Sequence, residues 1–225
     1  SAAGVCVATA ALVCVLSVMN GFNSVIEGMF SQFNPELVIR PASGKSLRTD
    51  SEEMQAVRQM REVAVFSPTV EETAMIAYME HQTPATVKGV DSLFQTLTAI
   101  DSIITDGYFE VYDGAFERCV LGRGLAAEIG TNAHFVGAIR FYAPKRTQRV
   151  NLMRPDQSLN KEVCYIAGTF AVNQVEYDDH LALVSLECAR RLFEYTEDDA
   201  TAVELRVAEG CSVAGAKRRI AAVLG

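Results

Sequence analysis

A long uncharged stretch at the start of the chain limits what this sequence can fold into. Residues 2–19 (AAGVCVATAALVCVLSVM) contain no Asp, Glu, Lys, Arg or His. A helix rises 1.5 Å per residue and needs about 20 apolar residues to cross a bilayer, so this run is almost long enough. We therefore expect a transmembrane helix. Two alternatives remain open, the apolar core of a signal peptide without a basic region before it, and a buried helix of a soluble protein.

The apolar pattern continues beyond this stretch in a different form. Between residues 20 and 33, apolar side chains recur at spacings of three and four, with polar residues between them: Phe22, Val25, Ile26, Met29 and Phe33. This period predicts an amphipathic helix. We expect residues 1–33 to form one transmembrane and stalk helix, which ends before Pro35 because proline cannot continue it.

Composition excludes some classes of partner. The chain has 225 residues, 49% of them hydrophobic and 21% charged, which allows one large or two small domains with a substantial core. The net charge of -8 argues against nucleic acid and against peripheral binding to anionic lipid. The six cysteines show no C-x-x-C spacing and mostly stand among apolar residues, so we expect buried free thiols rather than a zinc site or a disulfide framework.

Periodicity and turn residues outline an α+β chain. We expect strands at 35–41, 63–66, 70–80 and 85–90, with a break at Ser67-Pro68, and helices at 51–61, capped by Thr49, and at 92–104. Further strands are expected at 119–121, 138–143, 163–172, 181–185 and 202–207, with a bulge or close approach at Gly168. Helices are expected at 125–129, 186–195 and after a Ser212 cap.

The order of these elements suggests two subdomains. Residues 34–106 form a βαβ arrangement, and the βα unit of 201–225 resembles the first unit, 35–61, in order and length. We expect 34–106 and 201–225 to share one subdomain. Residues 107–200 would then be a mostly β subdomain inserted between them.

Catalytic motifs are weak throughout the chain. Gly122-x-Gly124 lacks the remaining residues of a nucleotide-binding loop, so it predicts a turn before a helix. The three histidines are scattered, and the cluster Glu176-Tyr177-Asp178-Asp179-His180 has no spacing typical of a metal site. We expect no catalytic residues, no metal and no cofactor.

One loop has the character of a binding surface. Residues 144–161 show no apolar period, and loops beyond about 12–15 residues in compact domains are commonly functional or disordered. Basic residues surround exposed aliphatic ones here: Lys145, Arg146, Arg149, Val150, Leu152, Met153 and Arg154. This mixture favours docking of another protein, although a solvated loop would look similar.

Several blocks of the sequence resemble one family. These are VLSVMNGF (15–22), VLGRGLAAEIG (120–130), IRFYAP (139–144) and IAGTFAVNQVEYDDHLALVSLECARRLF (166–193). Their order and content are similar to the lipoprotein-releasing permeases LolC and LolE, of the MacB/FtsX-like class of ABC transporter permeases. The block GTNAHFVGAIRF departs from that pattern, which usually has a Gly-Asp turn before the strand.

The resemblance implies a location, a fold and partners. Such a segment is the periplasmic domain of an inner-membrane permease, with a porter-like part and an inserted β-rich part called Sabre. The implied partners are a cytoplasmic ABC ATPase, a second permease subunit, a lipoprotein cargo and a LolA-like periplasmic carrier. Carrier contacts are expected at Arg149, Leu152, Met153, Arg154 and Pro155 in a hook-like loop, 144–161. Cargo contacts are expected at Phe22, Ile26, Met29, Phe30 and Phe33.

Three other functions fit parts of the same pattern. A MacB-like efflux permease would bind a periplasmic adaptor, and an FtsX-like regulatory permease would transmit motion to cell-wall hydrolases. A soluble periplasmic enzyme with an uncleaved signal would instead show a deep polar pocket with perturbed titratable groups.

Overall fold

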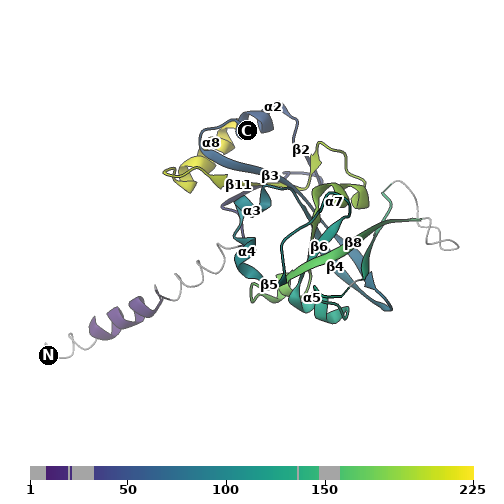
Figure 1. Ribbon diagram of the computed structural model, residues 1–225. Coiled ribbons are helices and arrows are strands. Elements are labelled where there is room, and N and C mark those ends of the chain that lie inside the picture. Colours follow the sequence, from purple (N-terminus) through teal and green to yellow (C-terminus); the bar gives the residue numbers. More distant parts are fainter. Residues whose placement is uncertain (1–8, 20, 22–32, 136, 147–157) are drawn as a thin grey trace.

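The computed structural model describes residues 9–19, 21, 33–135, 137–146 and 158–225 (Figure 1). Residues 9–19 are helical, and their apolar side chains are exposed, with Val18 at 71%. Within the described residues, no helix combines the length and the apolar character needed to span a membrane. Most of the expected stalk, residues 22–32, lies outside the described part of the chain.

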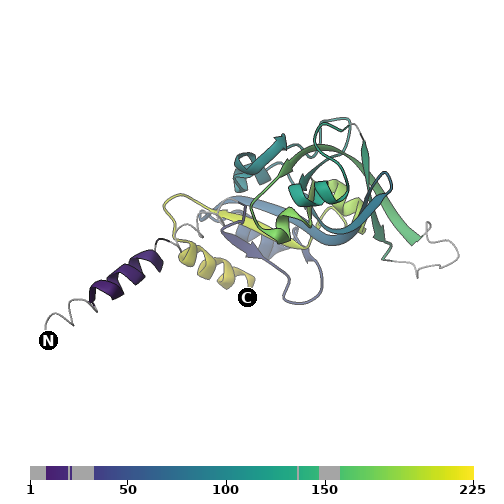
Figure 2. The same cartoon turned by 90° about the horizontal axis from the view of Figure 1, so that it is seen from below.

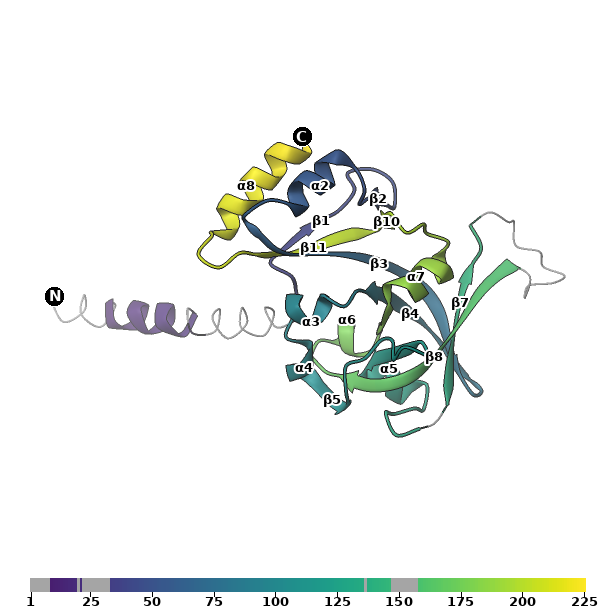
Figure 3. The same ribbon diagram turned by 45° about the horizontal axis from the view of Figure 1, so that its top comes forward.

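The two ends of the domain meet in a small antiparallel layer. Strand β11 (Ala202–Val207) pairs on one side with β1 (Leu37–Ile39) and on the other with the first part of β3 (Val63–Tyr78). Helices α2 (Glu52–Arg58) and α8 (Val213–Leu224) cover one face of this layer (Figure 3). The core between them contains Met54, Val57, Phe66, Val203, Leu205 and Ile220. A two-residue ladder of β2 (Leu47–Arg48) with β10 (Asp199–Ala200) lies beside it.

The second part of β3 enters a closed barrel. From β3 the ring runs through β4 (His81–Val90), β9 (Leu181–Ser185), β6 (Arg118–Gly122), β8 (Leu159–Phe170) and β7 (Ala138–Pro144). Pairing of β7 with β3 closes the ring, and the curvature of its strands is visible in Figure 2. Strand β5 (Ile104–Gly107) adds to β8 outside the ring.

Two hydrophobic clusters hold the barrel and its coverings together. The first joins alternate residues of the ring, such as Ile76, Leu121 and Phe141, with α5 (Arg123–Glu128) and α7 (Leu186–Phe193). The second lies under α3 (Phe94–Leu97) and α4 (Ile100–Ile103) and includes Tyr177 of α6 (Val175–Asp178) at its edge. Burial of these faces supplies the main driving force for the fold.

The expected α+β class is confirmed, and three local expectations are corrected. Strand β3 runs unbroken through Pro68, because there it pairs with β11 alone and its pairing with β4 begins at Val70, so the missing N–H is tolerated. Helix α2 is capped by Ser51, whose hydroxyl accepts a hydrogen bond from the Met54 amide, and not by Thr49. The single helix expected at 92–104 is broken by extended backbone at Thr98.

Other local expectations are confirmed. Ser212 caps α8, since its side chain accepts a hydrogen bond from the Gly215 amide. The β6–β8 ladder shifts register at Gly168, and a Cβ added there would lie 2.6 Å from the carbonyl oxygen of Tyr108. Gly122 ends β6 and is the N-cap of α5, as expected for a turn before a helix, and a Cβ added there would lie 2.3 Å from the carbonyl oxygen of Asp178. Close backbone approach therefore explains these glycines.

Candidate functional site

The first 33 residues, which we call the leading segment, join the domain at Phe33. Its ring is 3% exposed and stacks on Phe170, with centroids 5.5 Å apart and planes 15° apart. It also meets the edge of Phe94 at 6.2 Å and packs against Tyr177 at 5.1 Å. Aromatic pairs in these arrangements add to the stabilisation gained from buried area. Phe33 therefore fixes the start of the domain to the outer face of the barrel.

A buried ion pair lies next to this aromatic cluster. The ammonium of Lys88, in β4, donates to Glu204 Oε1, in β11, at 2.6 Å, and their side chains are only 6% and 7% exposed. The ammonium also lies 5.2 Å from the Phe94 ring centroid and 5.8 Å from that of Phe33. This contact joins the barrel, the three-stranded layer and the entry of the leading segment at one point.

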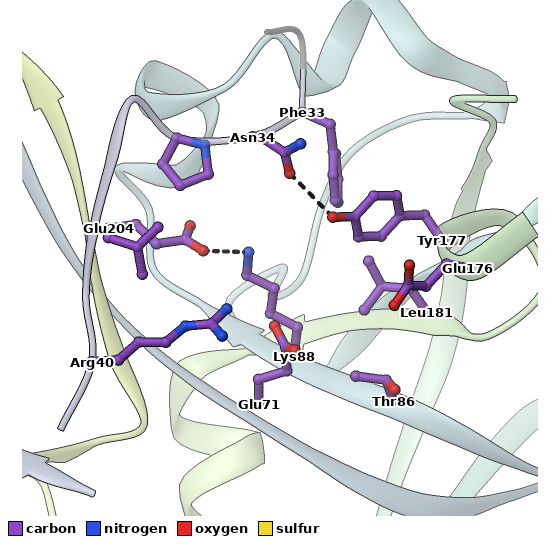
Figure 4. Close-up of a pocket in the computed structure, with 12 residues that line it drawn as sticks. Phe33, Asn34, Arg40, Glu71, Thr86, Lys88, Glu176, Tyr177, Leu181 and Glu204 are labelled. Carbon is purple, nitrogen blue, oxygen red and sulfur yellow. Dashed lines mark hydrogen bonds and ion pairs between the residues drawn. The ribbon is translucent and has the colours of Figure 1, made fainter. Parts of the chain in front are cut away.

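The ion pair lines a pocket of about 360 Å³ (Figure 4). Arg40 and Glu71 line the same pocket, and the Tyr177 hydroxyl donates to Asn34 Oδ1 at 3.2 Å across its rim. Burial, followed by the nearby carboxylate of Glu176, raises the pKa of Tyr177. Glu204 Oε2 is buried and has no hydrogen-bond partner among the described residues. We call this set of contacts the entry junction.

A second network holds the root of the expected 144–161 loop, which is shorter than expected because Pro144 belongs to β7 and residues 159–161 belong to β8. The Arg146 guanidinium lies over the Tyr195 ring, 3.8 Å from its centroid, and pairs with Glu72 of β3. Its backbone amide donates to Glu194 Oε2 at 2.8 Å, and the Tyr195 hydroxyl donates to Glu72 Oε1. Burial, followed by the hydrogen bond to Glu72, raises the pKa of Tyr195. This loop root fastens one end of the loop to the end of α7 and to β3.

The residues expected to bind partners fall mainly outside the described part of the chain. All five carrier candidates do so: Arg149, Leu152, Met153, Arg154 and Pro155. The same holds for the cargo candidates Phe22, Ile26, Met29 and Phe30. The structure places the fifth cargo candidate, Phe33, in the domain core, where only 3% of it is exposed.

The acidic cluster around α6 has structural roles. Asp178 Oδ1 accepts a hydrogen bond from the Val172 amide at 2.8 Å. Asp179 packs closely on Gly124, where an added Cβ would lie 1.8 Å from Asp179 Oδ1. Among the described residues, no group of three or more His, Cys, Asp and Glu side chains is arranged to hold a metal ion.

Sequence analysis missed the entry junction. Lys88 and Glu204 each stand between buried neighbours in a strand, Val87 and Gly89 in β4 and Val203 and Leu205 in β11. A charged residue in a buried strand is rare unless it is paired, so this pattern was the available signal. Which two charges meet could not be derived, because the partners are 116 positions apart.

Comparison with known proteins gives a consistent family and fold. Residues 1–223 match the family described as MacB-like periplasmic core domain. The fold is similar to the periplasmic region of MacB from Actinobacillus actinomycetemcomitans, at 7% identity and a TM-score of 0.57, covering 83% of this chain and 80% of that one. It is also similar to the extracellular domain of the ABC-type transporter YknZ from Gram-positive bacteria, at 13% identity and a TM-score of 0.53, covering 80% and 84%.

Proposed function

Because this chain belongs to the MacB-like periplasmic core domain family, we propose that it is the extracytoplasmic domain of a lipoprotein-releasing permease of the LolC/LolE kind. A separate cytoplasmic ATPase subunit would supply the energy, and a second permease subunit would complete the transporter. The lipoprotein would be lifted from the inner membrane and passed to a LolA-like periplasmic carrier. The domain itself is a non-catalytic part of the permease.

The observation that carries this proposal is the built root of the 144–161 loop. A solvated connection between β7 and β8 needs no such anchor, yet Arg146 is held by stacking on Tyr195, by the Glu72 carboxylate and by the Glu194 side chain. A planar guanidinium used in both stacking and pairing fixes direction as well as position. An anchored root suits a loop that must present side chains to a partner. The proposed carrier contacts are Arg149, Leu152, Met153, Arg154 and Pro155.

The cargo side of the proposal rests on the leading segment. Phe22, Ile26, Met29 and Phe30 recur at helical spacing and would present flexible and aromatic apolar surface to acyl chains. Phe33 would serve as the anchor that joins this surface to the domain, because its ring is buried against Phe170.

Carrier capture tests the proposal. The assembled permease would be incubated with a tagged LolA-like carrier, with Met153→Asp and Arg154→Glu compared with the unmodified chain. We expect a loss of carrier binding of tenfold or more in each variant, about 1.4 kcal/mol or more. Matched controls place the same changes elsewhere, Met79→Asp at an exposed turn and Arg218→Glu on α8, and should bind normally.

The outcomes separate the candidate functions. Carrier binding that ignores both loop substitutions would remove the loop from the mechanism. Absence of carrier binding by a folded, assembled permease would contradict lipoprotein release and favour a MacB-like efflux or FtsX-like regulatory permease. The entry junction favours the FtsX-like regulatory permease, which would transmit motion, because it connects the leading segment to both the barrel and the three-stranded layer. Capture of a cell-wall hydrolase by the same permease would support that alternative.

A further inference from the structure

Three cysteines lie in the core of the barrel. Cys119 is in β6, Cys164 in β8 and Cys188 in the first turn of α7, and none is more than 1% exposed. The sulfur atoms of Cys164 and Cys188 are 3.6 Å apart. Within the described residues, all of these thiols are free. Two thiols are thus in direct contact where a strand meets a helix.

The location of the domain makes this contact unusual. MacB-like periplasmic core domains face the extracytoplasmic space, and this chain belongs to that family. Disulfides form and persist in such oxidising compartments, whereas free thiols in contact are typical of the reducing cytosol. The inference below therefore depends on the location of the domain and not on lipoprotein release.

We propose that Cys164 and Cys188 are a modification site and are joined by a disulfide in the exported permease. An S–S bond is about 2.05 Å long, so the sulfur atoms must approach by roughly 1.5 Å. Cys188 lies in the first turn of α7, where its amide donates to Oγ of the cap residue Ser185 at 3.0 Å, so the approach falls to the two side chains or to a shift of the helix start. The bond would fasten α7 to β8 across a loop of 24 positions.

The chemistry requires an oxidant that is itself a disulfide. The thiolate of one cysteine attacks the disulfide of a thiol–disulfide oxidoreductase and forms a mixed disulfide. The second thiolate then displaces the enzyme sulfur. Two protons and two electrons leave the cysteine pair, and the enzyme disulfide is reduced to a dithiol. Cys164 and Cys188 are at most 1% exposed in the folded domain, so an oxidoreductase must reach them before α7 packs on the barrel.

The bond would have a consequence beyond stability. Helix α7 ends at Phe193, directly before Glu194 and Tyr195, which hold Arg146 at the loop root. Fastening the start of α7 to β8 would fix the helix that carries this root. The start of α7 would then be tied to β8, which follows the loop, and its end to Arg146, which follows β7.

The test traps thiols in the full-length permease isolated from membranes. Membranes are quenched in acid, denatured and alkylated with N-ethylmaleimide before and after reduction, and peptides are mapped by mass spectrometry. We expect a linked peptide pair containing Cys164 and Cys188 that is alkylated only after reduction. Cys119, equally buried, is the matched control and should be alkylated in both samples. Complete alkylation of Cys164 and Cys188 without reductant, or a link to Cys119, would overturn the proposal.

A second measurement compares the thermal stability of cysteine variants before and after reduction. Reduction under denaturing conditions followed by refolding should lower the unfolding temperature of the permease by roughly 5–10 °C. The Cys188→Ala variant should show no such dependence on reduction, whereas Cys119→Ala should retain it. Equal dependence in both variants would contradict the pairing of Cys164 with Cys188.

Discussion

Lys88 Nζ lies 2.6 Å from Glu204 Oε1 in a contact that excludes solvent almost completely. The two residues belong to β4 of the barrel and β11 of the three-stranded layer, so the pair crosses between the two parts of the domain. A buried ion pair adds little net stability compared with apolar side chains, but breaking it leaves an uncompensated charge. Its importance here is that it joins the two parts in one arrangement.

Removing one charge from this pair should destabilise the domain strongly. We expect Lys88→Met to lower the free energy of unfolding by about 3–5 kcal/mol, because the Glu204 carboxylate is left buried without a partner. The double variant Lys88→Met/Glu204→Leu should recover to within about 1 kcal/mol of the unmodified chain. Urea unfolding followed by circular dichroism measures both. A double variant as unstable as the single one would refute this account.

Removing the buried ring of Phe33 should destabilise the domain to a similar degree. We expect Phe33→Ala to lower the free energy of unfolding by about 3–5 kcal/mol, because the stacked ring of Phe170 loses its partner and a cavity opens. Phe135→Ala is the matched control, since that ring is 50% exposed and should change stability by less than about 0.5 kcal/mol. Similar losses in the two variants would argue against an anchor role.

The loop root should control carrier binding without controlling the fold. In the proposed function, Arg146→Ala releases contacts to Tyr195 and Glu72, so we expect carrier affinity to fall about tenfold while the circular dichroism spectrum is unchanged. Arg146→Lys should not restore it, because an ammonium cannot stack and pair as a guanidinium does. Arg140→Ala, at an exposed position of β7, provides the control. Full affinity in Arg146→Ala would leave the root without a role in docking.

Asp91 should give stability a measurable pH dependence. Burial raises the pKa of this carboxyl above its ordinary 3.8, although the Ser67 hydroxyl, 2.7 Å away, opposes the shift by donating to it. A raised folded-state pKa means that the folded chain binds the proton more tightly. Its contribution to stability is therefore full below pH 3.8 and is lost as pH rises through the folded pKa.

Comparison with Asp91→Asn isolates this effect. The amide oxygen can still accept from Ser67, but it does not ionise. The stability of the variant relative to the unmodified chain should therefore increase as pH rises from 3.8 through the raised folded-state pKa of the carboxyl. Denaturation at several pH values measures the difference. A difference that stays constant with pH would show that Asp91 has the same pKa in the folded and unfolded chains.

Local features of the fold were predictable from local chemistry. The cap at Ser212, the turn at Gly122 and the irregularity at Gly168 each follow from what one residue can do with its own backbone. The strands were found because their apolar residues alternate, as in 138–143 and 202–207. These signals extend over a few residues, so they need no knowledge of the partner strand.

The closed barrel and the two networks depend on long-range pairing. Periodicity indicates that β3 and β7 are strands, but not that Ile76 pairs with Phe141 to close the ring. The same limit explains why Lys88 could not be assigned to Glu204, or Arg146 to Tyr195. The strand break predicted at Pro68 was wrong for a related reason. A proline is tolerated where the strand pairs on one side only, and the topology of the sheet decides where that is.

Strand β3 is a single element that connects the three-stranded layer to the far side of the barrel. Its 16 residues, roughly 50 Å when extended, pair with β11 at one end and with β7 at the other. A pull on the leading segment reaches β1 just after Phe33, passes through β11 to β3, and arrives at Glu72, which grips the loop root. After the short connection of residues 34–36, each link is a hydrogen-bonded ladder or an ion pair. The entry junction and the loop root should therefore move together as one rigid body, so that a displacement of the leading segment is transmitted to the far end of the domain.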